Sequence, residues 1–216
     1  MINKKAFISD INIINNKYIL LYLEYDGEFV YKPGQYIIII FNEKLRRSYS
    51  IASVENGKIL IGVKLDQGEG TSALMKLKLK DNIEFIGPIG NFYYRESKKN
   101  PIFIATGIGI TPINSMIDYL VSINALNLKL FWGVKSEIDF IFNFDYLKDK
   151  FIPIISDRNT QFKNKGYVTD YLFKYIDDFS EKDFYICGDP KKVNDIREYL
   201  QFKFQVEKDS IYIEKF

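Results

Sequence analysis

The sequence predicts a two-domain protein: an antiparallel β-barrel over residues 1–98, followed by an α/β domain with a parallel sheet over residues 99–216. The first sign is a series of short apolar or alternating runs, broken by turn residues, that continues to about Tyr94 and is typical of a closed antiparallel sheet. The second is a change to strand and helix alternation beyond Pro101, which indicates parallel strands with right-handed crossovers. The length of 216 residues also fits two domains.

Six strands are expected in the barrel, and turn signals separate them. Asn56-Gly57 is the strongest of these signals, because this pair favours the tight turn of a β-hairpin. One helix is expected before the last strand, with Thr71 or Ser72 as its N-cap after a glycine-rich loop. The expected strands are residues 6–12, 17–24, 35–41, 47–50, 58–64 and 82–86.

In the second domain, strands are expected to alternate with helices. Ile113, Met116, Ile117, Leu120 and Val121 follow helical spacing and form a stripe that is expected to be buried and is more typical of a core than of a site. Strands are expected at residues 102–105, 128–133, 152–155, 184–187 and 210–213, and helices at residues 113–125, 137–148, 169–176 and 190–202.

The fourth expected strand carries four residues that suit a cofactor. Arg47 supplies a planar cation suited to a phosphate, and Tyr49 offers a flat face on which a ring can stack. Side chains alternate along a strand, so Arg47 and Tyr49 share one face while Ser48 and Ser50 share the other. Taken alone, the four residues also fit an edge strand with an exposed arginine, and motifs further along the chain favour the cofactor site.

Two glycine-containing loops are candidate phosphate sites. Residues 68–72, Gly-Glu-Gly-Thr-Ser, lead into the barrel helix, whose first amide groups favour an anion; the loop alone also fits an ordinary capped helix. Residues 106–112, Thr-Gly-Ile-Gly-Ile-Thr-Pro, follow an expected strand, with Thr111 as N-cap and Pro112 at the first helical position. Gly107 and Gly109 would let a dinucleotide pyrophosphate approach the backbone at the carboxyl ends of the strands.

A second strand of the α/β domain ends in Cys187-Gly188-Asp189-Pro190, where Asp189 and Pro190 predict a helix start. Cys187 would lie at the same sheet edge as the Gly107 loop. A lone buried cysteine more often behaves as a small hydrophobic residue. The order of the motifs, from the Arg-x-Tyr-Ser clamp through both glycine loops to Cys-Gly-Asp-Pro, favours a site.

Composition excludes several kinds of active site. The chain has no histidine, which rules out Ser-His-Asp catalysis, histidine-ligated haem and histidine zinc sites. Its single cysteine cannot form an intramolecular disulfide or hold an iron-sulfur cluster alone, and no metal site is expected. A net charge of +2 does not suggest nucleic acid. No apolar run approaches the roughly 20 residues that span a bilayer and no signal-peptide pattern is present, so a cytoplasmic protein without a membrane span is expected.

In the order of these motifs, the chain resembles the ferredoxin-NADP reductase family of flavoproteins over nearly its whole length. The resemblance implies an FAD-binding barrel, an NAD(P)-binding α/β domain, and hydride transfer between NAD(P)H and flavin N5. It implies that Arg47 contacts the flavin phosphate, that Tyr49 stacks on the isoalloxazine and that Ser50 hydrogen-bonds near N5. Further cofactor residues by resemblance are Ser48, Val63 and Lys64 beside the flavin, Gly70, Thr71 and Ser72 at the FAD pyrophosphate, and Gly107, Gly109, Thr111, Pro112, Cys187, Gly188 and Asp189 at NAD(P)H.

The resemblance also assigns roles at the end of the chain. Phe216 is expected to cover the flavin face where nicotinamide binds, and Glu214 to tune protonation nearby. Cys187 is expected beside the nicotinamide, with a positional role and no covalent chemistry. Together with Ser50, these are the residues predicted to take part in catalysis.

The sequence leaves two alternatives for the coenzyme, NADPH and NADH, and several for the electron acceptor. Ser156 and Arg158 are candidate cofactor residues. Arg158 and Lys135 could each bind a 2′-phosphate, but Asp157 could repel it, so both NADPH and NADH remain. The main hypothesis is electron transfer between NAD(P)H and a ferredoxin or flavodoxin. The alternatives are a flavin or ferric-chelate reductase with a diffusible substrate, and a non-catalytic electron-transfer subunit of a larger complex.

Overall fold

The computed structural model describes residues 3–216; Met1 and Ile2, with which the predicted barrel domain begins, lie outside the described residues. The chain forms two compact units. The first contains the residues up to Tyr94 together with Asn114–Tyr119, and the second contains Arg95–Ile113 and Leu120–Phe216. The domain boundary between residues 98 and 99 stays a prediction.

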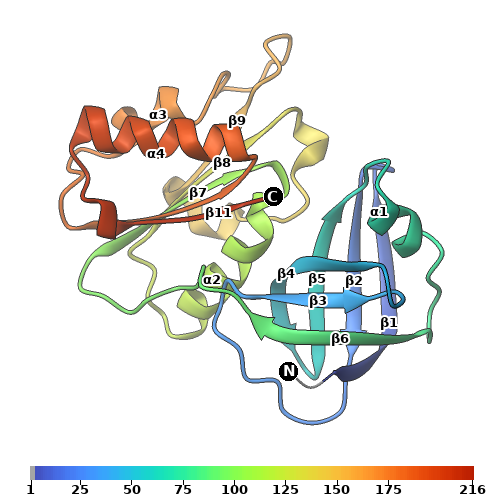
Figure 1. The fold of residues 1–216 in the computed structure, drawn as a ribbon. Helices are drawn as coiled ribbons and strands as arrows, with labels where there is room; N and C mark the ends of the chain where they lie inside the picture. Colours follow the sequence, from blue (N-terminus) through green and yellow to red (C-terminus); the bar gives the residue numbers. More distant parts are fainter. Residues whose placement is uncertain (1–2) are drawn as a thin grey trace. The chain divides into compact units, whose positions relative to one another are not determined.

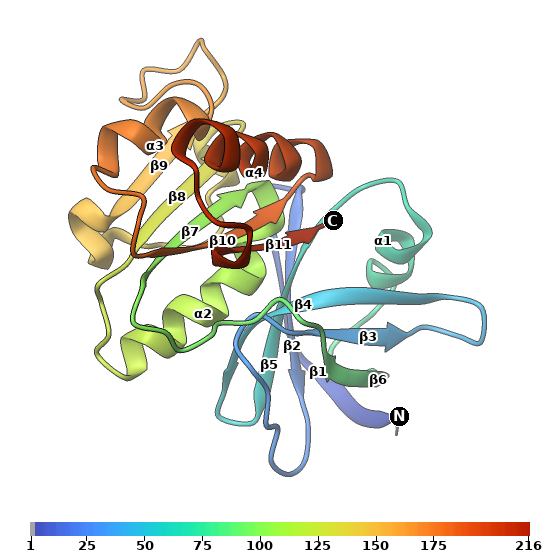
Figure 2. The ribbon, with the colours of Figure 1, turned by 60° about the vertical axis from the view of Figure 1, so that its left-hand side comes forward.

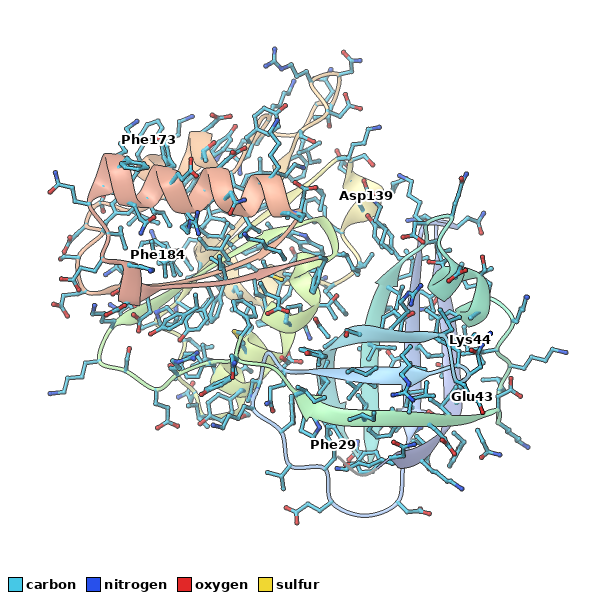
Figure 3. The ribbon with its side chains drawn as sticks, viewed as in Figure 1. Phe29, Glu43, Lys44, Asp139, Phe173 and Phe184 are labelled. Carbon is cyan, nitrogen blue, oxygen red and sulfur yellow. The ribbon has the colours of Figure 1, made fainter. Side chains whose placement is uncertain are left out.

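The first unit is a closed antiparallel barrel, as predicted (Figure 1). Its strands follow one another around the barrel in the order β1-β2-β5-β4-β3-β6. Buried isoleucine and leucine side chains fill the barrel, and Phe29, labelled in Figure 3, adds its ring from the loop between β2 and β3. The strands are β1 (Lys4–Ile14), β2 (Tyr18–Glu24), β3 (Tyr36–Ile40), β4 (Arg46–Glu55), β5 (Lys58–Lys64) and β6 (Asn82–Ile89).

The barrel helix, α1 (Glu69–Leu74), starts earlier than predicted. Its N-cap is Gly68 in an extended conformation, and neither Thr71 nor Ser72 caps it. The amide of Ser72 already donates to the carbonyl oxygen of Gly68, 3.0 Å away, so both predicted caps lie inside the helix. The predicted N-cap was therefore wrong, because the backbone turns into the helix directly at the glycine.

The second unit contains a five-stranded parallel sheet, also as predicted, with strand order β11-β10-β7-β8-β9. The chain builds β7, β8 and β9 in one direction and then returns to place β10 on the other side of β7. In open α/β sheets such a reversal creates a crevice at the carboxyl ends of the two strands concerned. The strands are β7 (Asn100–Thr106), β8 (Lys129–Val134), β9 (Phe151–Ile155), β10 (Lys182–Gly188) and β11 (Ile211–Lys215).

Helices α3 and α4 lie side by side over one face of this sheet (Figure 2). Val193, Ile196 and Leu200 of α4 and Leu172 of α3 pack with the apolar residues of that face. The α-helices after residue 94 are α2 (Ile110–Ser122), whose middle belongs to the first unit, α3 (Thr169–Tyr175) and α4 (Pro190–Phe204). The apolar stripe of α2 is buried as predicted except for Val121, which is 41% exposed. Within residues 3–216, none of the helices is both long and apolar enough to cross a membrane.

The helix expected over residues 137–148 is replaced by two short 3-10 turns, Glu137–Asp139 and Asp145–Lys150. Ser136 and Asp139 form a capping box at the first turn, and the chain then becomes extended at Phe140. The rings of Phe140 and Phe144 pack edge-on against buried Trp132, with centroids 5.0 and 5.9 Å away. The two phenylalanines reach the same indole from an irregular segment, and this packing overrides the helical pattern.

Candidate functional site

Three of the predicted cofactor residues meet on one face of the barrel. Arg47 and Tyr49 lie on β4 opposite Ile39 and Ile37 of β3, so they are two residues apart and point to the same side. A Cβ atom built on Gly70 would lie 2.8 Å from Cγ of Arg47 and 3.2 Å from Oη of Tyr49. Only a residue without a side chain lets the first turn of α1 approach both groups this closely.

The cluster combines an exposed cation with a neutral ring. Burial raises the pKa of Tyr49 to about 12, although the nearby Arg47 charge acts in the opposite direction. The Tyr49 phenol is therefore uncharged at physiological pH. The Arg47 side chain is 45% exposed; its Nη1 donates to the carbonyl oxygen of Arg46 at 2.9 Å, and its Nη2 lies 3.4 Å from Oε2 of Glu69.

Asp66, which sequence analysis missed, organises the loop before α1. Its Oδ1 accepts hydrogen bonds from the Thr71 hydroxyl at 2.6 Å and from the Gly68 amide at 2.8 Å. These hydrogen bonds, that from Thr71 first, lower the pKa of the Asp66 carboxyl. The hydroxyl proton of Thr71 is thus used inside the loop, and the hydroxyl stabilises the loop that carries Gly70.

The remaining predicted flavin residues lie on neighbouring positions of the same barrel. Ser50 is buried opposite Tyr36 of β3, whereas Ser48 is exposed. At the end of β5, Val63 points into the barrel core and Lys64 is exposed. Their contacts with a flavin stay predictions.

In the second unit, the Gly107 loop lies against the end of β10. A Cβ on Gly109 would overlap the carbonyl of Cys187, and a Cβ on Gly188 would overlap the side-chain and carbonyl oxygens of Thr106. The loop is held further by Trp132, whose Nε1 donates to the carbonyl oxygen of Gly107 at 2.9 Å. The two glycine motifs that sequence analysis selected therefore pack against each other at the carboxyl ends of β7 and β10, where the reversal of strand order is expected to place a crevice.

The start of α2 differs from the prediction. Residues 107–109 form a 3-10 turn that runs directly into α2 at Ile110. The hydroxyl of Thr111 donates to the carbonyl oxygen of Ile108 at 2.9 Å, so it does not accept from an amide as an N-cap would. Pro112 consequently falls at the third position of the helix, and the predicted Thr111 cap was wrong. By contrast, Asp189 caps α4 as expected, with Oδ1 accepting from the Lys192 amide at 3.0 Å and Pro190 at the first position.

A cavity of about 350 Å³ opens beside this crevice. It is lined by the ends of β7, β8 and β9, by residues 166–169 and by the first turns of α4. Two predicted residues, Ser156 and Asp189, line it. Sequence analysis missed six others with polar or aromatic side chains that line it: Thr106, Tyr167, Thr169, Lys191, Lys192 and Asp195. Thr106 ends a strand and Lys191 and Lys192 follow the Asp-Pro helix start, which was a weak positional signal, whereas nothing in the sequence marked Tyr167.

The predicted cofactor residues that follow β9 separate in the structure. Ser156 lines the cavity and donates through its hydroxyl to the carbonyl oxygen of Val134 at 3.2 Å. Asp157 and Arg158 are exposed and outside the cavity lining. The Asp157 carboxylate accepts from the amide of Asn159 at 2.9 Å, so it turns back onto its own loop.

The predicted residues of the last strand lie next to the end of β10. Glu214 is opposite Cys187 in the parallel register, and the amide of Phe216 donates to the carbonyl oxygen of Gly188 at 3.1 Å. Burial raises the pKa of the Cys187 thiol well above its ordinary value, with the Glu214 charge adding to this effect. Burial also raises the pKa of Glu214. Half of the Phe216 side chain is exposed.

Two family models match the chain, one over each of these sites. A model described as an oxidoreductase FAD-binding domain matches residues 5–94, and one described as an oxidoreductase NAD-binding domain matches residues 103–198. The barrel cluster and the crevice with its cavity therefore lie in the segments assigned to FAD and to NAD. Glycines at 70, 109 and 188 are buried where a side chain would collide with a neighbouring segment, so they allow the loops at both sites to pack closely.

Curated relatives match over most of the chain. The toluate 1,2-dioxygenase electron transfer component of Pseudomonas putida is 26% identical over 227 residues, which cover 98% of this chain and 67% of that protein. The CDP-6-deoxy-L-threo-D-glycero-4-hexulose-3-dehydrase reductase of Yersinia pestis is 33% identical over 170 residues, covering 73% of this chain and 51% of that protein, about half its length. A probable flavin reductase of Photobacterium leiognathi is 27% identical over 203 residues, covering 86% of this chain and 84% of that protein.

A solved structure of the ferredoxin-NADP+ reductase from Plasmodium falciparum has the same fold. Its TM-score is 0.80 at 24% identity, with 99% of this chain and 96% of that chain covered. The motifs, the fold and the two family models agree. The chain belongs to the ferredoxin-NADP reductase-like family of oxidoreductases, whose cofactors are FAD and NAD(P)H.

Proposed function

We propose that the chain transfers electrons between NAD(P)H and a separate carrier protein, ferredoxin or flavodoxin, by way of FAD. The observation that carries this proposal is the pairing of two sites in one chain. One is the cluster of Arg47, Tyr49 and Gly70 on the barrel, and the other is the glycine-lined crevice and cavity at the end of the parallel sheet. The first suits a flavin with a phosphate, and the second a dinucleotide.

In the barrel, the chain's own residues bind and orient the flavin. Arg47 holds a phosphate oxygen through a charge-assisted hydrogen bond, and Tyr49 presents a neutral ring for stacking. Gly70 keeps α1 close without a side chain in the way, and Asp66 fixes the loop through Thr71. Bound FAD supplies the capacity to accept a hydride and to release electrons singly.

In the second unit, the cavity that Thr106 and Asp189 line is the proposed nucleotide site, and Lys191 and Lys192 offer cations there for phosphate groups. The cavity volume of about 350 Å³ falls within the usual range of small-molecule pockets. The raised pKa keeps the Cys187 thiol neutral, which supports a positional role beside the nicotinamide without covalent chemistry.

The acceptor distinguishes two candidate functions. The similarity to a dioxygenase electron transfer component supports a protein acceptor. The probable flavin reductase supports a second candidate, reduction of free flavin or a ferric chelate, because the match covers 84% of that relative's length.

The proposal is tested with purified protein under anaerobic conditions. The cofactor is released and identified by chromatography, and the flavin spectrum is then followed during titration with NADH and, separately, NADPH. The reduced protein is next mixed with ferredoxin, flavodoxin, free riboflavin or a ferric chelate. We expect FAD, bleaching by a reduced nicotinamide nucleotide, and faster oxidation by one of the carrier proteins than by either small acceptor.

Two results would contradict this assignment. Protein that binds no FAD, or FAD that neither coenzyme reduces, would remove the proposed activity. Preferential oxidation by riboflavin or the ferric chelate would replace the protein acceptor with the second candidate.

A further inference from the structure

A carboxylate lies beside the cation that is proposed to hold the flavin phosphate. Oε2 of Glu69 is 3.4 Å from Nη2 of Arg47. Nη1 of the same guanidinium donates to the carbonyl oxygen of Arg46, so both of its terminal nitrogens have an acceptor within the protein. The guanidinium keeps further N–H donors, but an anion that approaches Nη2 meets the Glu69 carboxylate and must share that nitrogen with it or displace it.

Backbone packing places Glu69 beside Arg47, while its carboxylate is exposed to solvent. Gly70 follows Glu69 directly, and its close approach to Cγ of Arg47 and Oη of Tyr49 holds the first turn of α1 over the clamp. The Glu69 side chain is 82% exposed, so it can rotate away into solvent. Such exposed ion pairs are weak, which allows a phosphate to displace the carboxylate at a small cost.

We propose that Glu69 competes with the flavin phosphate for Arg47 and thereby makes the flavin readily exchangeable. The inference rests on the proposed function, because it assumes that Arg47 binds that phosphate. Glu69 acts in two ways. It occupies a donor of Arg47 before the cofactor binds, and its negative charge stays near the phosphate afterwards. Both effects weaken binding of a flavin that carries a phosphate, and neither acts on riboflavin, which carries none.

The test compares wild type with Glu69→Gln, which removes the charge and keeps the side-chain size. Flavin is removed from each protein, and dissociation constants for FAD, FMN and riboflavin are measured by fluorescence titration, with dissociation rates by stopped flow. We expect FAD and FMN to bind about threefold to tenfold more tightly to Glu69→Gln, mainly through slower dissociation. Riboflavin affinity is expected to stay the same.

The chain offers a matched control. Glu24 forms an ion pair with Lys58 at 3.7 Å in the same barrel, with side chains 40% and 45% exposed. Lys58 lies opposite Glu55, the last residue of β4, whereas Arg47 is the second residue of that strand, so the two pairs are at opposite ends of β4. Glu24→Gln changes the net charge by the same amount and should leave the affinity for all three flavins unchanged.

The Arg47→Ala background separates competition from general repulsion. The competition needs the guanidinium, so Glu69→Gln should increase the affinity for FAD and FMN less in the Arg47→Ala background than in wild type. Three results would overturn the inference. Glu69→Gln could raise FAD affinity as much in the Arg47→Ala background as in wild type, it could raise riboflavin affinity equally, or it could leave FAD affinity unchanged. If wild type still binds FAD and is reduced by NAD(P)H in those cases, the proposed function stands. If no variant binds a flavin, the proposed function fails and the inference fails with it.

Discussion

The carboxylate of Asp66 accepts a hydrogen bond from the Thr71 hydroxyl across 2.6 Å and thereby sets the loop that brings Gly70 over Arg47. Neither Asp66 nor this contact is part of the glycine-rich pattern that marks the loop in the sequence. The cofactor clamp therefore depends on a residue outside the motif that identifies it.

Asp66→Asn is expected to lower stability in a pH-dependent way. The hydrogen bonds lower the pKa of Asp66 in the folded protein below the ordinary value of 3.8, so the ionised carboxylate stabilises the fold above that pH. This stabilisation is lost as the pH falls through the lowered pKa. The melting temperature of wild type should be higher than that of Asp66→Asn at pH 7, and the difference between the two melting temperatures should shrink toward pH 3. Exposed Asp26→Asn is the control, and a difference that is constant with pH would contradict the assignment.

Arg47→Ala is expected to weaken FAD binding by about 1.5–3 kcal/mol, or roughly tenfold to a hundredfold, because a charge-assisted contact with a phosphate is lost. Fluorescence titration of flavin-free protein measures the change. Arg46→Ala is the control, since Arg46 is exposed, has the same chemistry and points to the other face of β4. Equal losses in both variants would indicate a general charge effect and would remove Arg47 from the site.

Lys192→Gln is expected to raise the KM for the nicotinamide nucleotide about threefold to tenfold with little change in flavin affinity, because Lys192 lines the cavity in the second unit. Steady-state kinetics with NADH and NADPH measure the effect for each coenzyme. Lys203→Gln, near the other end of α4, removes the same charge outside the cavity lining and should leave KM unchanged. A larger rise in KM for NADPH than for NADH would indicate that Lys192 binds the 2′-phosphate. An unchanged KM for both coenzymes would remove Lys192 from the nucleotide site.

Glu214→Gln is expected to raise the stability of the protein relative to wild type, and to raise it more at neutral pH than at acid pH. Burial raises the pKa of Glu214 in the folded state, so folding favours the protonated carboxyl. Wild-type stability therefore falls as the pH rises from the ordinary value of 4.5 through the raised pKa, and the neutral amide avoids this loss. Melting temperatures at pH 4 and pH 8 should show the difference between variant and wild type growing with pH. A constant difference would mean that Glu214 ionises normally in the folded protein.

Much of the architecture could be predicted because it follows from side-chain periodicity. The alternating runs gave the barrel strands, and the strand and helix alternation gave the parallel sheet. Residues 137–148 were mistaken for a helix because Phe140 and Phe144 are placed by contact with Trp132, a partner that the local pattern does not contain. The helix starts at Thr71 and Thr111 failed for a related reason: each hydroxyl donates a hydrogen bond nearby instead of capping.

The site could be predicted only where a motif carries its own geometry. Arg47 and Tyr49 share a face because β-strands alternate, and Asp189-Pro190 begins a helix as expected. Tyr167 and Lys192 come to one cavity because separate segments fold together at the carboxyl ends of the strands. Nothing in their local sequence distinguishes them from other exposed residues, so the tertiary structure was needed to find them.

The closed barrel limits how another protein can attach to this chain. Each strand from β1 to β6 has two hydrogen-bonded neighbours, so none of them is an edge strand along its whole length. Short stretches have a neighbour on one side only: residues 46–50 of β4 pair with β3, and residues 10–14 of β1 pair with β2. The sheet of the second unit does have outer edges, at β9 and β11. The end of β9 is already engaged, because Ile155 exchanges backbone hydrogen bonds with Asn164 and Gly166. A partner that binds by extending a sheet along a whole edge strand would therefore have to use β11 or the start of β9, whereas the barrel offers such a partner only short stretches of strand.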